Sequence, residues 1–234
     1  MMRNMKRILV FQSRSDPMRI EREAERFRIA VGTSAEADFL SAVDEKLAWT
    51  TPERLLAGYD GVIFGGSSEF DFDGGRTEED PARLMSLVIL SRAKNIIAHA
   101  LECGVPLLGI CYGHQLVANM YGGNVRNDKE QTKFGSYEVQ LTESGKLDRL
   151  FKDMPDSFIA QYAHRDSVTE LPEGATLLAS SKGCKFSALR YGPRAYTTQF
   201  HPEVTRFDDL PLEYRDSSEA SRLVSLWVER VVAT

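Results

Sequence analysis

Apolar and polar residues alternate in blocks along the chain, and these blocks predict strands and helices in turn. The apolar run 6–12 (KRILVFQ) predicts a buried first strand. The charged segment 19–31 after it carries apolar residues at helical spacing, namely Ile20, Ala24, Phe27 and Val31. Segments 38–45 and 60–68 predict further short strands, and Thr51-Pro52 marks the start of a helix between them. This order of elements predicts a parallel sheet with helices on both faces.

The same order continues through the middle of the chain. A long helical pattern over 83–103 ends at Gly104, segment 105–110 predicts a strand, and a helical pattern over 113–123 ends in two glycines. In open parallel sheets, ligands bind at the carboxyl ends of the strands. Gly65-Gly66 and Cys111 both follow predicted strands, so we expect them at the same edge of the sheet.

The pattern changes after Asn124, where the apolar segments become short and alternating. They are separated by Gly and Pro and predict several strands, some of them antiparallel, at 134–142, 158–168, 175–181, 186–192 and 195–203. A last amphipathic pattern predicts a helix over about 217–233, with Leu223, Leu226, Trp227 and Val231 on its apolar face. We therefore expect one α/β domain over residues 1–234, with its core at about 6–205. Its mostly parallel central sheet would be flanked by helices and would carry a small antiparallel β extension.

Composition and charge narrow the classes of function. With 42% hydrophobic and 27% charged residues, the 234-residue chain has the composition of an ordinary globular protein. A formal net charge of −5 leaves no basic surplus for a nucleic-acid backbone, and this argues against non-specific nucleic-acid binding. The sequence MMRNMKRILVF lacks the apolar core of a signal peptide, and segments such as 105–110 are too short to span a membrane. We expect a cytoplasmic protein with no membrane partner and a small neutral or zwitterionic ligand.

The chain has three cysteines, Cys103, Cys111 and Cys184. Their irregular spacing matches neither a disulfide framework nor a metal site. Cys111 stands out because residues 109–113 (GICYG) have the form of a nucleophile elbow with cysteine in place of serine. Glycines two residues from the nucleophile avoid collisions at such a turn, and a helix beginning there offers free N–H groups and a positive dipole end. The motif alone is equally compatible with a buried core thiol. The other two cysteines are expected to be structural.

A nucleophilic thiol needs a base, and four histidines are available. His99 lies within a predicted helix, and His114 lies on the helix that leaves the elbow, so we expect its ring to point away from the sulfur. His201 is followed by Pro202 and Glu203, which places a carboxylate where it would orient the imidazole. Backbone N–H groups at Gly65-Gly66 would complete the site as donors for an oxyanion. Together, these three motifs favour catalysis by a thiol nucleophile.

These motifs, with Gln115, Phe134-Gly135 and segment 163–168 (AHRDSV), resemble the class I (triad) glutamine amidotransferases. Within that family the resemblance is to the amidotransferase domain of GMP synthase, and it runs from about Lys6 to Thr205. It implies the family's flavodoxin-like fold and a Cys-His-Glu triad that needs no cofactor. Such a triad hydrolyses the side-chain amide of glutamine through a γ-glutamyl thioester and releases ammonia.

The resemblance also implies a role for each matching residue. Cys111 is the nucleophile, His201 is the base and then the acid to the leaving amine, and Glu203 orients His201. The backbone of Gly66 and Tyr112 forms the oxyanion hole. The α-amino and α-carboxylate ends of the substrate are held by Gln115 and by the backbone at Arg165 and Asp166.

Two departures from the family concern the mouth of the site and the fate of ammonia. The GMP synthase domain usually has Gly-Gly-Pro where this chain has Gly65-Gly66-Ser67, and the segment up to residue 80 is its own. These 234 residues contain no ATP-pyrophosphatase motif, so the resemblance implies that ammonia passes to a separate synthetase partner.

Other interpretations use the same residues. The triad would equally serve a free-standing hydrolase or transpeptidase of γ-glutamyl peptides or amines, which releases an amine instead of ammonia. A non-catalytic regulatory module could keep the fold, although an intact triad argues against it. Related chaperone- and protease-like proteins have histidine directly after the elbow cysteine, where this chain has Tyr112.

Overall fold

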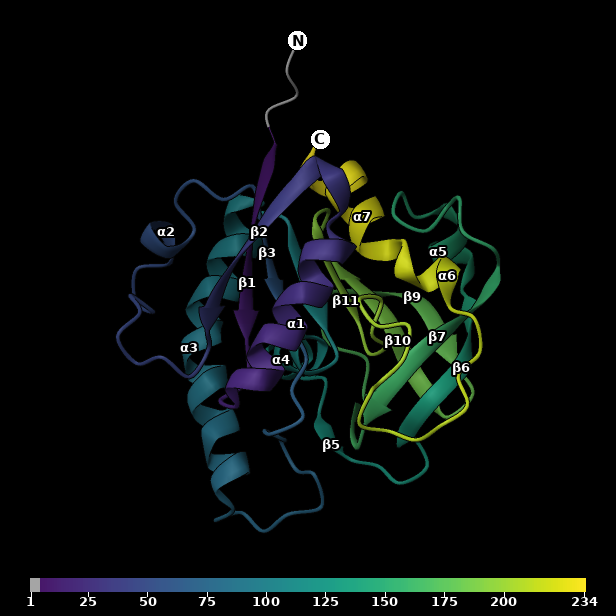
Figure 1. Ribbon diagram of the computed structural model, residues 1–234, viewed down its shortest axis with the longest axis horizontal. Coiled ribbons are helices and arrows are strands. Elements are labelled where there is room, and N and C mark those ends of the chain that lie inside the picture. The colour runs from purple at the N-terminus through teal and green to yellow at the C-terminus, as the bar shows by residue number, and fades with distance from the viewer. Residues whose placement is uncertain (1–4) are drawn as a thin grey trace.

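A nine-stranded sheet runs through the protein, whose computed structural model describes residues 5–234 (Figure 1). The first four residues of the MMRNMKRILVF segment lie outside the described part. The strands follow the order β2-β1-β3-β4-β11-β10-β9-β6-β7. Their bounds are β1 Lys6–Gln12, β2 Ala35–Ser41, β3 Gly61–Phe64, β4 Leu107–Ile110, β6 Lys133–Leu141, β7 Ser157–His164, β9 Ala175–Ser181, β10 Cys184–Tyr191 and β11 Ala195–Thr198. A separate antiparallel pair joins β5 (Val125–Asn127) to β8 (Asp166–Val168).

The sheet has a parallel half and an antiparallel half. Strands β2, β1, β3, β4 and β11 pair in parallel. Strands β10, β9, β6 and β7 continue the same sheet with antiparallel pairing. The α/β fold with an antiparallel extension is therefore confirmed, and the extension is an integral part of the main sheet. Short turns with left-handed glycines, Gly183 and Gly192, allow the chain to reverse between neighbouring strands here.

The α-helices of residues 5–234 are α1 Pro17–Ala30, α2 Pro52–Leu55, α3 Pro81–Cys103, α4 Tyr112–Met120, α5 Glu143–Leu147, α6 Ser218–Ser221 and α7 Leu223–Trp227. Side chains cap the first turns of α1, α3 and α5. The carboxylates of Asp16 and Asp80 accept hydrogen bonds from the first turns of α1 and α3, so α1 starts two residues before the expected position. The single helix expected at 217–233 is divided into α6, α7 and a π-helical turn, Val228–Val232.

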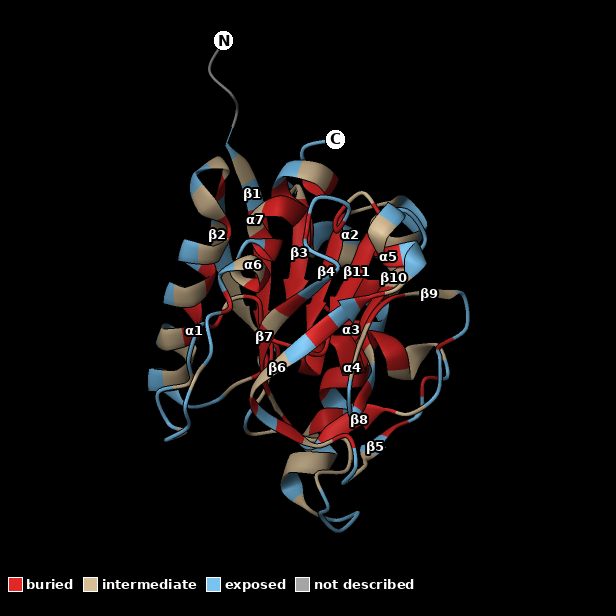
Figure 2. Cartoon of the chain, turned by 90° about the vertical axis from the view of Figure 1, so that its right-hand side faces the viewer, coloured by how far each residue is buried: buried red, intermediate tan, exposed pale blue. Residues whose placement is uncertain are grey.

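Helices cover both faces of the sheet, and the strands between them are largely buried (Figure 2). Alternate residues of each strand point to opposite layers. On one face, Ile8 and Val10 of β1 share a core cluster with Phe27 of α1 and Trp227 of α7. On the other face, Leu9 and Phe11 of β1 belong to a second cluster with residues of α3 and α4, which includes Ile96. Helix α3 is long and apolar enough to cross a membrane by length and composition alone, a test that core helices also pass. Its buried face packs into this second cluster.

Trp227 offers a test of the first core layer, because it is fully buried next to Gly61, where a Cβ atom would lie 2.9 Å from its ring. Trp227→Ala should lower the free energy of unfolding by about 3–5 kcal/mol through lost burial and a residual cavity. Urea denaturation followed by circular dichroism measures this change. Leu147→Ala is the control, since Leu147 is 84% exposed and its truncation should change stability by less than about 0.5 kcal/mol. Equal effects of the two substitutions would contradict this assignment of the core.

Candidate active site

Cys111 sits on a strained turn between β4 and α4. Its backbone has φ 52° and ψ −97°, a region that residues other than glycine rarely occupy. Hydrogen bonds on both sides hold the turn, because the Cys111 amide donates to the Thr198 carbonyl at 2.7 Å and the Gly113 amide donates to the Gly65 carbonyl at 3.1 Å. The turn is thus tied to the ends of the two strands that flank β4.

The glycines around Cys111 are required by close backbone contacts. A Cβ atom at Gly113 would lie 2.1 Å from the carbonyl oxygen of Phe64, and one at Gly109 would lie 2.7 Å from the carbonyl oxygen of Gly113. A side chain at Gly113 would therefore force the elbow away from β3, and one at Gly109 would force the first turn of α4 away from β4. This is the steric reason for the Gly-x-Cys-x-Gly pattern.

His201 and Glu203 follow β11 and form a short buried pair. The Nδ1 atom of His201 lies 2.7 Å from Oε1 of Glu203, and the Phe207 ring packs edge-on against the imidazole at 5.2 Å between centroids. Burial lowers the pKa of His201, but the Glu203 carboxylate and the Cys111 sulfur beside it more than offset this, so that the pKa is raised to about 10. These neighbours therefore favour the charged form of the imidazole.

The glycine turn after β3 lies against both of these residues. A Cβ atom at Gly66 would stand 2.8 Å from Cε1 of His201 and 3.6 Å from Cβ of Cys111. The structure thus brings together the three motifs that are far apart in the sequence. The N–H groups of Gly66 and Tyr112 have no backbone acceptor among residues 5–234, which leaves them available to a ligand.

Two other buried histidines near the pocket are held neutral. Nδ1 of His114 lies 2.8 Å from Oγ1 of Thr197, and Nδ1 of His164 donates to the Asp166 carbonyl at 3.0 Å. Burial lowers the pKa of each imidazole to about 3. The His114 ring points to the Thr197 hydroxyl on β11. This orientation agrees with the expectation that His114 is not the base.

The three residues expected to hold the substrate line the same cavity as Cys111. Nε2 of Gln115 donates to the Asp166 carbonyl at 2.7 Å, and the Asp166 carboxylate accepts the N–H groups of Asp73 at 2.8 Å and Gly74 at 2.7 Å. Asp166 therefore also anchors the segment after the glycine turn, a role that the sequence did not indicate. The Arg165 guanidinium lies 5.8 Å from the centroid of the Phe134 ring.

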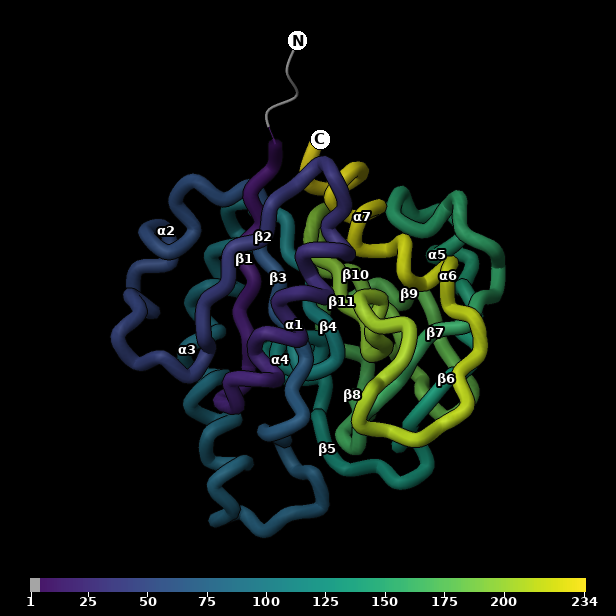
Figure 3. The backbone as a smooth tube through the Cα atoms, viewed as in Figure 1, coloured from purple at the N-terminus to yellow at the C-terminus, as the bar shows by residue number. Residues whose placement is uncertain are grey.

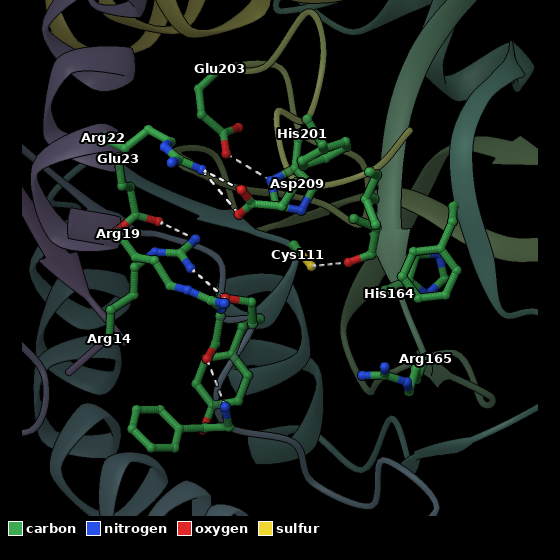
Figure 4. Close-up of a pocket in the computed structure, with 18 of the residues that line it drawn as sticks. Arg14, Arg19, Arg22, Glu23, Cys111, His164, Arg165, His201, Glu203 and Asp209 are labelled. Atoms are coloured by element: carbon green, nitrogen blue, oxygen red, sulfur yellow. Dashed lines mark hydrogen bonds and ion pairs between the residues drawn. The ribbon is translucent and has the colours of Figure 1, made fainter. Parts of the chain in front are cut away.

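Cys111, His201 and Glu203, together with the three residues expected to hold the substrate, line one cavity of about 320 Å³ (Figure 4). Sequence reasoning missed two further walls, one formed by arginines and one by residues that follow the His-Pro-Glu motif. The first wall consists of Arg14, Arg19, Arg22 and Arg26, and the second consists of Phe207, Asp208, Asp209 and Leu210. The spacing 19, 22 and 26 places three arginines on one helical face, which is the signal that would have suggested a shared surface.

Comparison with known proteins agrees with this geometry. Residues 74–209 match the family model described as glutamine amidotransferase class-I. One subunit of a glutamine-hydrolysing GMP synthase from Methanocaldococcus jannaschii is 41% identical over 117 residues, which cover 49% of this chain and 60% of the relative. The corresponding protein from Archaeoglobus fulgidus is 33% identical over 156 residues, which cover 66% of this chain and 72% of the relative.

Solved structures show the same fold. A putative GMP synthase subunit from Thermoplasma acidophilum has a TM-score of 0.71 at 23% identity, over 98% of this chain and 95% of that one. A glutamine amidotransferase from Thermotoga maritima has a TM-score of 0.64 at 25% identity, over 97% and 82% of the two chains. With a family model that spans more than half of its residues, the chain belongs to the class I glutamine amidotransferase family.

Proposed function

We propose that the protein hydrolyses the side-chain amide of glutamine with Cys111 as nucleophile. The observation that carries the proposal is the meeting of Cys111, His201 and Gly66 in one cavity, with Glu203 bonded to the imidazole. The thiolate attacks the amide carbon, and a γ-glutamyl thioester forms as the carbon–nitrogen bond breaks. His201 gives its proton to the departing amine, then activates the water that releases glutamate and restores the thiol.

The tetrahedral intermediate needs donors at its oxyanion, because an amide is a poor electrophile. In this proposal the N–H groups of Gly66 and Tyr112 supply them. Their lack of backbone acceptors among residues 5–234 supports this role, as does the position of Tyr112 at the first turn of α4, where the helix dipole favours negative charge.

The amino-acid end of glutamine is proposed to bind at Gln115 and Arg165, with Asp166 as their support. The amide nitrogen of Gln115 donates to the Asp166 carbonyl. The amide oxygen of Gln115 is then left as the acceptor for the substrate ammonium group. Arg165 lines the cavity and forms no ion pair with an acidic side chain of residues 5–234, so its guanidinium is available to the α-carboxylate.

Ammonia released here is proposed to pass to a separate synthetase partner. Support comes from the relatives described as one subunit of glutamine-hydrolysing GMP synthase, since that name implies a second polypeptide in those organisms. This chain covers 60% of the length of the first of them, so the acceptor of the ammonia is part of the proposal.

Substitution of the nucleophile tests the thioester mechanism. Cys111→Ala should reduce glutamine hydrolysis by at least about 10⁴-fold, because the covalent route is lost. The exposed Cys103 provides the control, and Cys103→Ala should retain full activity. Hydroxylamine should trap γ-glutamyl hydroxamate with the wild type and not with Cys111→Ala. If the wild type, alone or with the synthetase, hydrolyses no glutamine, the proposed function is wrong.

The pH dependence tests the His201–Glu203 pair. The folded pKa of His201, about 10, lies above the ordinary value of about 6.5. The charged imidazole therefore stabilises the folded protein. This stabilisation is complete at a pH below the ordinary pKa of histidine and is lost as the pH rises through the pKa of His201 in the folded protein. Glu203→Gln removes the largest stabilising charge, so the pKa of His201 and the alkaline limb of the activity profile should both move to lower pH. Glu203→Asp, which keeps the charge, should move them less. NMR titration of the His201 ring gives the pKa directly, and an unmoved pKa in Glu203→Gln would contradict the coupling.

Arg165→Ala tests the carboxylate site. Loss of a charge-assisted hydrogen bond should raise KM for glutamine by about 5- to 50-fold and change kcat by less than about 2-fold, since the contact is equal in the ground and transition states. Arg126→Ala is the matched control, because Arg126 is exposed and lies outside the cavity. An unchanged KM in Arg165→Ala would exclude the guanidinium as a ligand of the α-carboxylate.

A further inference from the structure

The wall of the cavity beside the glycine turn is formed by arginines. Arg14 follows β1, while Arg19, Arg22 and Arg26 lie along α1, and all four share the cavity with Cys111. Figure 4 shows the labelled arginines of this wall on one side of Cys111, with His164 and Arg165 on the other side. The second side is the proposed site for the amino-acid end of the substrate. The arginine wall therefore faces the leaving group of the amide.

Three of these arginines are neutralised by acids of the same chain. Arg14 pairs with the buried Glu23 at 3.0 Å. Arg22 and Arg26 pair at 3.0 Å with Asp209 and Asp208, which lie on the segment that follows β11 and crosses in front of β6–β8 before α6 (Figure 3). These pairs hold the wall in place, and their charges are already compensated.

Arg19 differs from its neighbours, because its guanidinium rests on a neutral group. Nη1 of Arg19 donates to Oγ of Ser68, and no acidic side chain of residues 5–234 forms an ion pair with it. The same hydroxyl accepts Nη1 of Arg14 at 3.0 Å, so both lone pairs of the serine oxygen are used. Ser68 thereby orients Arg19 at the cavity and leaves its charge and its other N–H groups for an anion.

Ammonia carries no negative charge, so an oriented and uncompensated guanidinium beside the leaving group gives no advantage for glutamine itself. A carboxylate attached to the leaving amine, in contrast, matches the planar fork of a guanidinium. We propose that the site also accepts γ-glutamyl conjugates of amino acids, whose terminal carboxylate binds Arg19. The inference rests on the proposed thioester chemistry and adds a second substrate class to it.

The reaction balances without a co-reactant other than water. The Cys111 sulfur bonds to the γ-carbonyl carbon, the carbon–nitrogen bond breaks, and the amino group of the released amino acid takes its proton from His201. Water then adds to the thioester carbon and gives a proton to His201 as the sulfur departs. The products are glutamate and a free amino acid.

Two substrates that differ only in the carboxylate test the proposal. The leaving group of γ-glutamylglycine bears the carboxylate, and that of γ-glutamylmethylamide lacks it. The wild type should prefer γ-glutamylglycine by about 10- to 100-fold in kcat/KM, the range expected for one charge-assisted contact. Arg19→Ala should abolish this preference and change the hydrolysis of γ-glutamylmethylamide and glutamine by less than about 2-fold. Arg19→Lys should retain part of it.

Arg28→Ala is the matched control on the same helix, since Arg28 is 50% exposed, pairs with Glu21 and lies outside the cavity. Calorimetric binding of both conjugates to Cys111→Ala gives a readout independent of catalysis, and γ-glutamylglycine should bind more tightly there unless Arg19 is also replaced. Equal affinity and equal cleavage of the two conjugates would overturn the proposal. If glutamine hydrolysis depends on Cys111 while neither conjugate binds, the second substrate class is excluded and the proposed function stands.

Discussion

The backbone of Cys111 is the constraint on which the rest of the site depends. A non-glycine residue at φ 52° and ψ −97° costs on the order of 1–3 kcal/mol, and surrounding structure must hold it there. Gly113 packs against the Phe64 carbonyl, and the Cys111 amide bonds to Thr198. These contacts come from β3 and β11, the two strands next to β4. A sheet buried on both faces thus supplies the rigidity that keeps the thiol exposed to the cavity at the start of α4.

A compact set of charges surrounds this thiol. The pair His201–Glu203 and the pair Arg14–Glu23 are both largely withdrawn from solvent, and burial of such groups is costly unless each has a partner. Gly65 lies against the second pair, since a Cβ atom there would lie 2.9 Å from Oε1 of Glu23. The glycine turn therefore serves two purposes, because it brings Gly66 against His201 and makes room for a buried carboxylate behind it.

The motifs of the proposed triad could be found in the sequence because each is set by local geometry. A cysteine between two glycines after an apolar strand, and a carboxylate two residues from a histidine, are both recognisable within a few positions. The contact of the Asp166 carboxylate with Asp73 and Gly74 joins residues 93 and 92 positions apart, and no local pattern indicates it. The arginines of α1 had the spacing of an ordinary solvated face. Their orientation into the cavity follows from how α1 packs on the sheet, which is a tertiary property. The division of the C-terminal helix is likewise not indicated by a local pattern, and the fully buried Trp227 lies where α7 meets the π-helical turn.

The elbow and the mouth of the cavity are held by interactions of different strength. Backbone hydrogen bonds and close glycine contacts within the core fix Cys111, and their loss would disturb the sheet itself. The mouth is closed on one side by Asp208 and Asp209, whose ion pairs with α1 are partly exposed and are therefore weak. Ser68 and Arg19 lie at the surface of the same wall. We therefore expect changes at the mouth to disturb the fold less than changes at the elbow, so that the group bound at the mouth can differ while the geometry around Cys111 is kept.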